Sequence, residues 1–103
     1  MAEFVKVAET RDVPEGEMKV VEVHGEPIVI ANIGGQFYAF NNSCPHAAGP
    51  LADGYLEEDV VECPYHGSQF NVRTGENISG PASGPVQTYT VQLEGSDIKI
   101  SVD

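Results

Sequence analysis

The sequence predicts an all-β domain, a small antiparallel sandwich or barrel. Short runs rich in valine, isoleucine and aromatic residues recur along the chain and are separated by Gly, Pro, Asn and Asp residues that favour turns. The C-terminal run alternates, with Ile98, Ile100 and Val102 on one face, as a half-buried strand does. No window of about eleven residues or more shows the 3.6-residue apolar period of an amphipathic helix. Spacing of this kind favours strands throughout the chain.

The expected strands can be placed in chain order because a turn signal stands between each run and the next. In the N-terminal half, the Gly34-Gly35 pair is a strong hairpin signal, and the expected strands cover residues 3–7, 18–23, 27–33 and 36–40. In the C-terminal half they cover residues 54–56, 60–62, 69–72, 86–93 and 98–102. The run at 86–93 also alternates, which places Tyr89, Val91 and Leu93 on one face.

Composition limits both the size of the fold and the kind of partner. With 103 residues and 41% apolar content, the chain is long enough for one modest core, so we expect a single domain over residues 1–103. Sixteen acidic residues against five basic ones leave a net charge of −11. Nucleic acids and anionic membranes are bound through Lys and Arg, so this balance argues against both as partners. It suits a protein that docks onto basic surfaces, or one that the acidic residues simply keep in solution.

The N-terminal residues, MAEFVKVAET, contain no apolar core of signal-peptide length, and no stretch approaches the roughly 18 apolar residues of a membrane span. We therefore expect a cytoplasmic protein. In that reducing compartment a disulfide between Cys44 and Cys63 is not expected, and metal binding becomes the leading explanation for the two cysteines.

Two short loops each contain one cysteine and one histidine. Cys44 and His46 form a C-x-H pair in SCPHAAGPL, and Cys63 and His66 form a C-x-x-H pair in ECPYHGSQF. Thiolates and imidazoles are ligands for zinc, copper and iron. The expected hairpin over residues 54–62 lies between the two loops and could bring their ends side by side. Zinc fingers of the Cys2His2 type pair two cysteines and then two histidines, so the mixed pairing points to another kind of metal site.

The two Cys/His loops, here called the first box (with Cys44 and His46) and the second box (with Cys63 and His66), resemble the cluster-binding motifs of the Rieske-type ferredoxins. CPHAAGPL is similar to the first box of that family and CPYHGSQFNVRTG to the second, and the resemblance extends to SGPASGPV at residues 79–86. It implies a Rieske-type fold with cluster-binding loops at about 43–52 and 63–70. A proline loop at about 79–85 is implied as a third wall over the cluster.

The resemblance also implies the cofactor and its ligands. It implies one 2Fe–2S cluster of the Rieske type, with Cys44 and Cys63 on one iron and His46 and His66 on the other. Neutral imidazoles in place of two thiolates remove negative charge, so potentials of Rieske clusters run from roughly −150 to +300 mV, against about −400 mV for plant-type clusters.

The chain departs from the respiratory members of this family. Those proteins carry a further cysteine in each box, joined as a disulfide over the cluster, and here Gly49 and Tyr65 occupy these places. They also carry a serine and a tyrosine whose hydroxyls raise the potential. This sequence keeps Ser68 but has Phe70 in the place of the tyrosine, so we expect a potential towards the low end of the range. Whether Ser68 donates to the cluster or is a turn hydroxyl on solvent stays open.

The resemblance implies a one-electron carrier rather than an enzyme. The best match is the ferredoxin component of a bacterial aromatic-ring-hydroxylating dioxygenase system, a monomer that passes electrons from an NAD(P)H-dependent flavoprotein reductase to the terminal oxygenase. A catalytic iron of the oxygenase type needs two further histidines and a carboxylate, and only His24 remains, which we expect to be a solvated turn residue. The alternatives are the small subunit of a nitrite-reductase-type system and a structural Cys2His2 zinc module.

Charge is distributed unevenly around the two boxes. Residues 41–52 and 63–72 contain no charged residue, and residues 20–72 contain neither Lys nor Arg. Acidic residues lie between the boxes: Asp53, Glu57, Glu58, Asp59 and Glu62. Two neutral boxes with acidic residues beside them suit a transient contact with a partner that is oriented by charge. The acidic run at 57–59 also suits a solvated hairpin turn.

Overall fold

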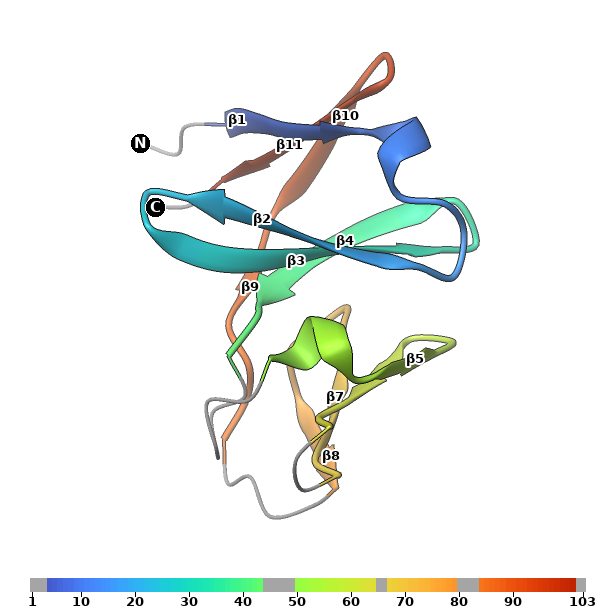
Figure 1. The fold of residues 1–103 in the computed structure, drawn as a ribbon, viewed down its shortest axis with the longest axis vertical. Helices are drawn as coiled ribbons and strands as arrows, with labels where there is room; N and C mark the ends of the chain where they lie inside the picture. The colour runs from blue at the N-terminus through green and yellow to red at the C-terminus, as the bar shows by residue number, and fades with distance from the viewer. Residues whose placement is uncertain (1–3, 44–49, 65–66, 80–83, 102–103) are drawn as a thin grey trace.

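The computed structural model describes residues 4–43, 50–64, 67–79 and 84–101 (Figure 1). Within these ranges the regular elements are β-strands and two short 3-10 helices, η1 (Thr10–Asp12) and η2 (Leu51–Asp53). The described strands form three antiparallel sheets. The all-β antiparallel fold expected from the sequence is therefore confirmed.

The first sheet joins the two ends of the described chain. It consists of β1 (Phe4–Glu9), β11 (Asp97–Ser101) and β10 (Val91–Glu94), in that spatial order. Ile98 and Ile100 are fully buried, as their alternation predicts, while Val102 lies outside the described residues.

The second sheet has the order β2-β3-β4-β9, with β2 at Met18–Val23, β3 at Glu26–Ile33, β4 at Gln36–Asn41 and β9 at Thr88–Tyr89. Two-residue turns join its first three strands, His24-Gly25 and Gly34-Gly35, and all four residues have positive φ angles. Turns with two such residues match the right-handed twist of the paired strands. The hairpin predicted at Gly34-Gly35 is therefore present, and His24-Gly25 forms a second one.

The run at 86–93, expected to be a single strand, serves two different sheets. Its first part, β9, pairs with β4, whereas its second part, β10, pairs with β11. The chain passes from one sheet to the other at Thr90, so the alternation does not give one buried face. Tyr89 and Val91 pack against a core cluster, whereas Leu93 is 47% exposed, so the three residues expected on one face do not share one environment.

The third sheet lies at the lower end of the view in Figure 1 and consists of short strands. Its order is β5-β6-β7-β8, with β5 at Tyr55–Glu57, β6 at Val60–Glu62, β7 at Gln69–Asn71 and β8 at Asn77–Ser79. Strand β8 was not predicted, because NIS is short and polar and has only one apolar residue to show a strand period.

Two hydrophobic clusters explain why the sheets stack. Val29 and Ala31 of β3 join a cluster with the third sheet, whereas Ile28 and Ile30 join a cluster with the first sheet. Because β3 is covered on both faces, its sequence is a nearly continuous apolar run rather than an alternating one. The cluster with the third sheet also contains Cys63, so the core and the expected metal site adjoin each other.

Candidate metal centre

Of the four expected ligands, the structure describes only Cys63. Cys44, His46 and His66 lie outside the described residues, so the ligand set itself stays a prediction. The described residues, with one expected ligand among them, contain no group of three or more His, Cys, Asp or Glu side chains placed to hold a metal ion. What the structure does show is how the segments on either side of the expected ligands are held.

Cys63 lies directly after β6 and is 1% exposed, with a free thiol. It packs in the same hydrophobic cluster as Leu51, Val61 and Phe70. Its backbone N–H donates to the carbonyl of Ser68 at 2.8 Å, and the N–H of Gly67 donates to the carbonyl of Cys63 at 3.1 Å. These bonds close the second box at its base.

The second box requires a glycine at one position. Gly67 has φ +77, in the left-handed region that residues with a side chain rarely adopt. Ser68, the next residue, is fully buried. The reading of Ser68 as a turn hydroxyl on solvent is therefore wrong, because its side chain lies inside the protein.

The ends of the first box are also held together. Ser43 and Pro50, which flank residues 44–49, form an antiparallel β-bridge. The N–H of Leu51 donates to the carbonyl of Asn42 at 2.7 Å, and the Asn42 side-chain oxygen accepts from the N–H of Ala52 at 2.9 Å. The segment that contains Cys44 and His46 therefore begins and ends at one place, beside Leu51 of the core that also contains Cys63.

Gly54 brings the two boxes into contact. A Cβ atom on Gly54 would collide with the carbonyl oxygen of Glu62 and would lie 3.1 Å from Cδ of Pro64. The chain that leaves the first box thus passes directly against the backbone that enters the second. The hairpin of β5 and β6 lies between the boxes, as expected, and brings their ends side by side, with Tyr55 opposite Glu62.

The arrangement fits a bound metal cofactor. A buried thiol that is not in a disulfide, at the closed base of a Cys/His loop and next to a second such loop, can supply a thiolate ligand shielded from water. The donor set of two cysteines and two histidines is chemically suited to an iron–sulfur cluster of mixed ligation.

The segment after β8 lies against the turn that follows β7. The N–H of Val86 donates to the carbonyl of Gly75 at 2.9 Å, and a Cβ atom on Gly75, which has φ +82, would collide with the carbonyl oxygen of Val86. Residues 80–83 of the expected proline loop lie outside the described residues, whereas Ser79, Gly84 and Pro85 are described.

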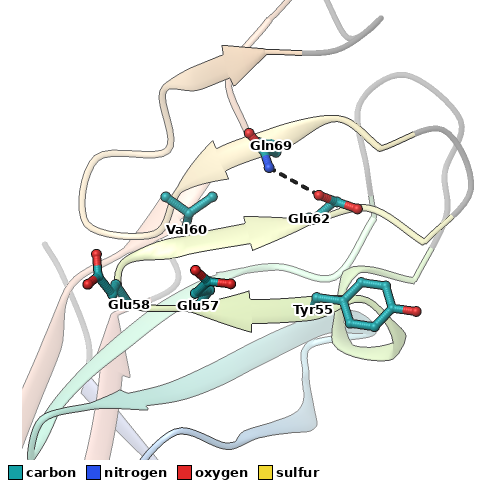
Figure 2. A pocket seen from close by; sticks show the side chains of 6 residues that line it. All are labelled: Tyr55, Glu57, Glu58, Val60, Glu62 and Gln69. Carbon is teal, nitrogen blue, oxygen red and sulfur yellow. Dashed lines mark hydrogen bonds between the residues drawn. The ribbon is translucent and has the colours of Figure 1, made fainter.

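An open hollow of about 240 Å³ lies on the outer face of the third sheet. Figure 2 shows carboxylates from β5, its turn and β6 around it, with the ring of Tyr55 at one end. Its lining residues are Tyr55, Glu57, Glu58, Val60, Glu62 and Gln69. Cys63 does not line it, so this hollow is a feature of the acidic outer surface rather than the described part of the metal site.

The basic side chains are mostly paired elsewhere. Lys6 lies 3.1 Å from Asp97, and this hydrogen bond and charge raise the pKa of Lys6 above its usual value. Arg11 and Lys99 also pair with acidic residues of the first sheet or its flank. On the third sheet, Arg73 lies 3.7 Å from Asp59. The carboxylates of Glu57 and Glu58 have no such cation among the residues that the structure describes, so this face is strongly negative.

His24 belongs to a hairpin of the second sheet and not to either box. It is exposed in the turn between β2 and β3, with φ +53. Its expected role as a solvated turn residue is confirmed.

Among the described residues there is no helix long and apolar enough to cross a membrane.

Comparison with known proteins gives a consistent result. The family model described as Rieske [2Fe-2S] domain matches residues 3–90. The ferredoxin component of biphenyl 2,3-dioxygenase from Rhodococcus jostii (strain RHA1) is 43% identical over 100 residues, which are 97% of this chain and 94% of the relative.

Solved structures show the same fold. The ferredoxin of carbazole 1,9a-dioxygenase from Nocardioides aromaticivorans IC177 has a TM-score of 0.93 and 30% identity, over 97% of this chain and 98% of the other. A chain in the complex of reduced oxygenase and oxidized ferredoxin in carbazole 1,9a-dioxygenase has a TM-score of 0.90 and 33% identity, over 95% of this chain and 92% of the other.

Proposed function

We propose that this chain, which belongs to the Rieske 2Fe–2S domain family, carries single electrons to the terminal oxygenase of a ring-hydroxylating dioxygenase system. The observation that carries the proposal is the 43% identity, over nearly the full length of both chains, to a protein named as such a ferredoxin component. The chain is an electron-carrier component and not a catalytic subunit. We propose that residues 1–103 form one domain, that it acts as a monomer, and that it is cytoplasmic.

The cofactor is one 2Fe–2S cluster of the Rieske type. We propose that Cys44 and Cys63 hold one iron and that His46 and His66 hold the other, in accordance with the mixed pairs in the two boxes. When bound, the cluster supplies reversible one-electron chemistry. The chain contributes the closed bases of both boxes, the apolar packing around Cys63, and the exclusion of water from its thiol.

Two buried side chains next to Cys63 bear on the potential. Phe70 is fully buried in the same cluster as Cys63 and has no hydroxyl to donate to a sulfur. Ser68 is equally buried, so its hydroxyl is placed inside the protein near the base of the second box. The sequence provides a serine at one of the two positions and no tyrosine at the other, which supports a potential in the low part of the Rieske range.

The proposed partners are a reductase and an oxygenase. An NAD(P)H-dependent flavoprotein reductase would supply the electrons, and the terminal oxygenase would accept them one at a time. The solved complex of oxygenase and ferredoxin in carbazole 1,9a-dioxygenase supports the second contact here. The relatives are dioxygenase components, so they favour this system over a nitrite-reductase-type one, and family membership removes the support for a zinc module.

Reconstitution with purified components tests this function. We expect an oxygenase and a flavoprotein reductase encoded beside this chain to oxidise an aromatic substrate with NAD(P)H only when the chain is added. The measurement is product formed per electron pair consumed, with and without the chain. Turnover that is equally fast without the chain, or an oxygenase that fails to reoxidise the reduced chain, would contradict the proposal.

A further inference from the structure

Three polar side chains form a hydrogen-bonded row across the third sheet. The side-chain amide of Gln69 on β7 donates from Nε2 to Oε1 of Glu62 on β6 at 3.0 Å, as Figure 2 shows. Its carbonyl Oε1 accepts from the hydroxyl of Ser79 on β8 at 2.9 Å. The three residues thus link β6, β7 and β8 through their side chains, in addition to the backbone ladder.

The row lies at the bases of the segments that we expect around the cluster. Glu62 directly precedes Cys63, and Gln69 directly follows Ser68, so their hydrogen bond closes the second box from outside. Ser79 is the last described residue before the 80–83 segment. Gly54, at the exit of the first box, packs on the carbonyl of Glu62.

The backbone ladder is irregular where the row crosses it. Between β7 and β8 the register shifts after Gln69, which pairs with Ser79 while Phe70 pairs with Asn77. A shift of this kind leaves part of the ladder unpaired. The Asn77 side chain compensates by donating to the carbonyls of Gln69, at 3.2 Å, and of Ser79, at 3.1 Å. Side-chain bonds therefore hold β8 to β7 at this point.

Gln69 suits its place in the row because an amide can donate and accept at once. An ionised Glu62 only accepts, and the serine hydroxyl meets Gln69 as a donor. A carboxylate at position 69 would place two negative oxygens against each other, and an apolar side chain would leave both neighbours without this bond. Glu62 and Gln69 are half-buried, so water replaces the lost bond less well than on an open surface.

We propose that Gln69 is a positioning residue for the cluster: its two side-chain bonds fix the base of the second ligand box against the start of the proline segment and hold the Glu62 carboxylate in place beside Cys63. The inference rests on the proposed function, because it takes Cys63 and His66 as ligands. Loss of the row lets the second box and β8 move independently, so the cluster is lost faster. It also moves a negative charge relative to Cys63, so the reduction potential changes.

An exchange of the two side chains tests the proposal. Gln69→Glu places a second carboxylate against that of Glu62, so a half-buried hydrogen bond is replaced by repulsion between like charges. We expect this variant to lose its cluster about tenfold faster than the parent. Glu62→Gln keeps an acceptor oxygen for Gln69 and is expected to change the rate by less than about twofold. The double variant Glu62→Gln/Gln69→Glu restores the bond with its polarity reversed and the original net charge, so its rate should return to within about twofold of the parent rate.

Three measurements on the cluster-loaded protein read out the effect. Bleaching of the visible spectrum in a chelator gives the rate of cluster loss, and voltammetry gives the potential. Glu57→Gln, on the same face, serves as the control for charge alone. Hydrogen–deuterium exchange over residues 59–79 reports on the hydrogen-bonded row independently of the visible spectrum, and we expect faster exchange in Gln69→Glu that is reversed in the double variant.

Variants at Ser79 keep the proposal testable if Gln69→Glu does not fold. Ser79→Ala removes one bond of the row and is expected to speed cluster loss and exchange by a smaller factor, while Ser79→Thr keeps the hydroxyl and should behave as the parent. A double variant that loses its cluster as fast as Gln69→Glu overturns the proposal, as does a Ser79→Ala variant indistinguishable from the parent. A Cys63→Ser protein that keeps its cluster would instead overturn the proposed ligand set.

Discussion

Cys63→Ser is expected to yield a colourless protein that contains neither iron nor inorganic sulfide. Serine has nearly the same size as cysteine, but its hydroxyl does not ionise at neutral pH and is a poor ligand for iron next to sulfide. Because metal binding and folding are coupled when ligands come from separate loops, the variant should also unfold at a lower temperature. Iron and sulfide analysis with a visible absorption spectrum measures the first effect, and a thermal melt measures the second.

The same loss is expected for Cys44→Ser, because each box supplies one thiolate in the proposed ligand set. His24→Ala is the matched control: it removes an exposed histidine from a turn of the second sheet, so the spectrum and the iron content should be unchanged. Full iron and sulfide content in either serine variant would show that the assignment of ligands is wrong.

Removal of two carboxylates from the third sheet is expected to slow association with the proposed redox partners. Glu57 and Glu58 line the acidic hollow, and within the described structure neither has an ion pair, whereas Asp59 is already paired with Arg73. Long-range attraction between opposite charges raises encounter rates by factors of about 10 to 1,000 at low salt. We expect Glu57→Gln/Glu58→Gln to lower the association rate about tenfold at low ionic strength.

The difference should vanish as salt is added, because screening acts over about 8–10 Å at 0.10–0.15 M. Glu22→Gln/Glu94→Gln removes the same number of charges from the other two sheets and should change the rate much less. Stopped-flow reduction by the reductase at several salt concentrations measures both variants. A parent rate that is indifferent to salt, or that rises with it, would mean that the acidic residues do not steer docking.

The strands that the sequence predicts well are those with local signals. The Gly34-Gly35 hairpin follows from the positive φ angles that glycine readily adopts, and it is present. The alternation of Ile98 and Ile100 follows from one buried strand face, and both residues are buried. The division of the 86–93 run between two sheets could not be predicted, because it depends on which strands β9 and β10 meet. Likewise β8 forms because β7 is beside it, and its own residues carry little strand signal.

The sequence indicates the part of the candidate site that is marked by short motifs. The C-x-H and C-x-x-H pairs point to a metal, and their resemblance to the Rieske boxes points to the cluster. The role of Gly54 was not predictable, because a glycine next to a strand has many uses and only the packing against Glu62 shows this one. The Glu62–Gln69–Ser79 row was also missed, because it depends on strand register rather than on any sequence spacing.

A potentiometric titration of the purified protein, followed by its visible spectrum, tests whether the chain carries a one-electron Rieske cluster. We expect a red-brown protein that takes up one electron per chain, with a slope of about 59 mV per decade and a midpoint between about −150 and 0 mV. A colourless zinc protein, a two-electron slope, or a midpoint near the roughly −400 mV of clusters with four cysteine ligands would contradict it.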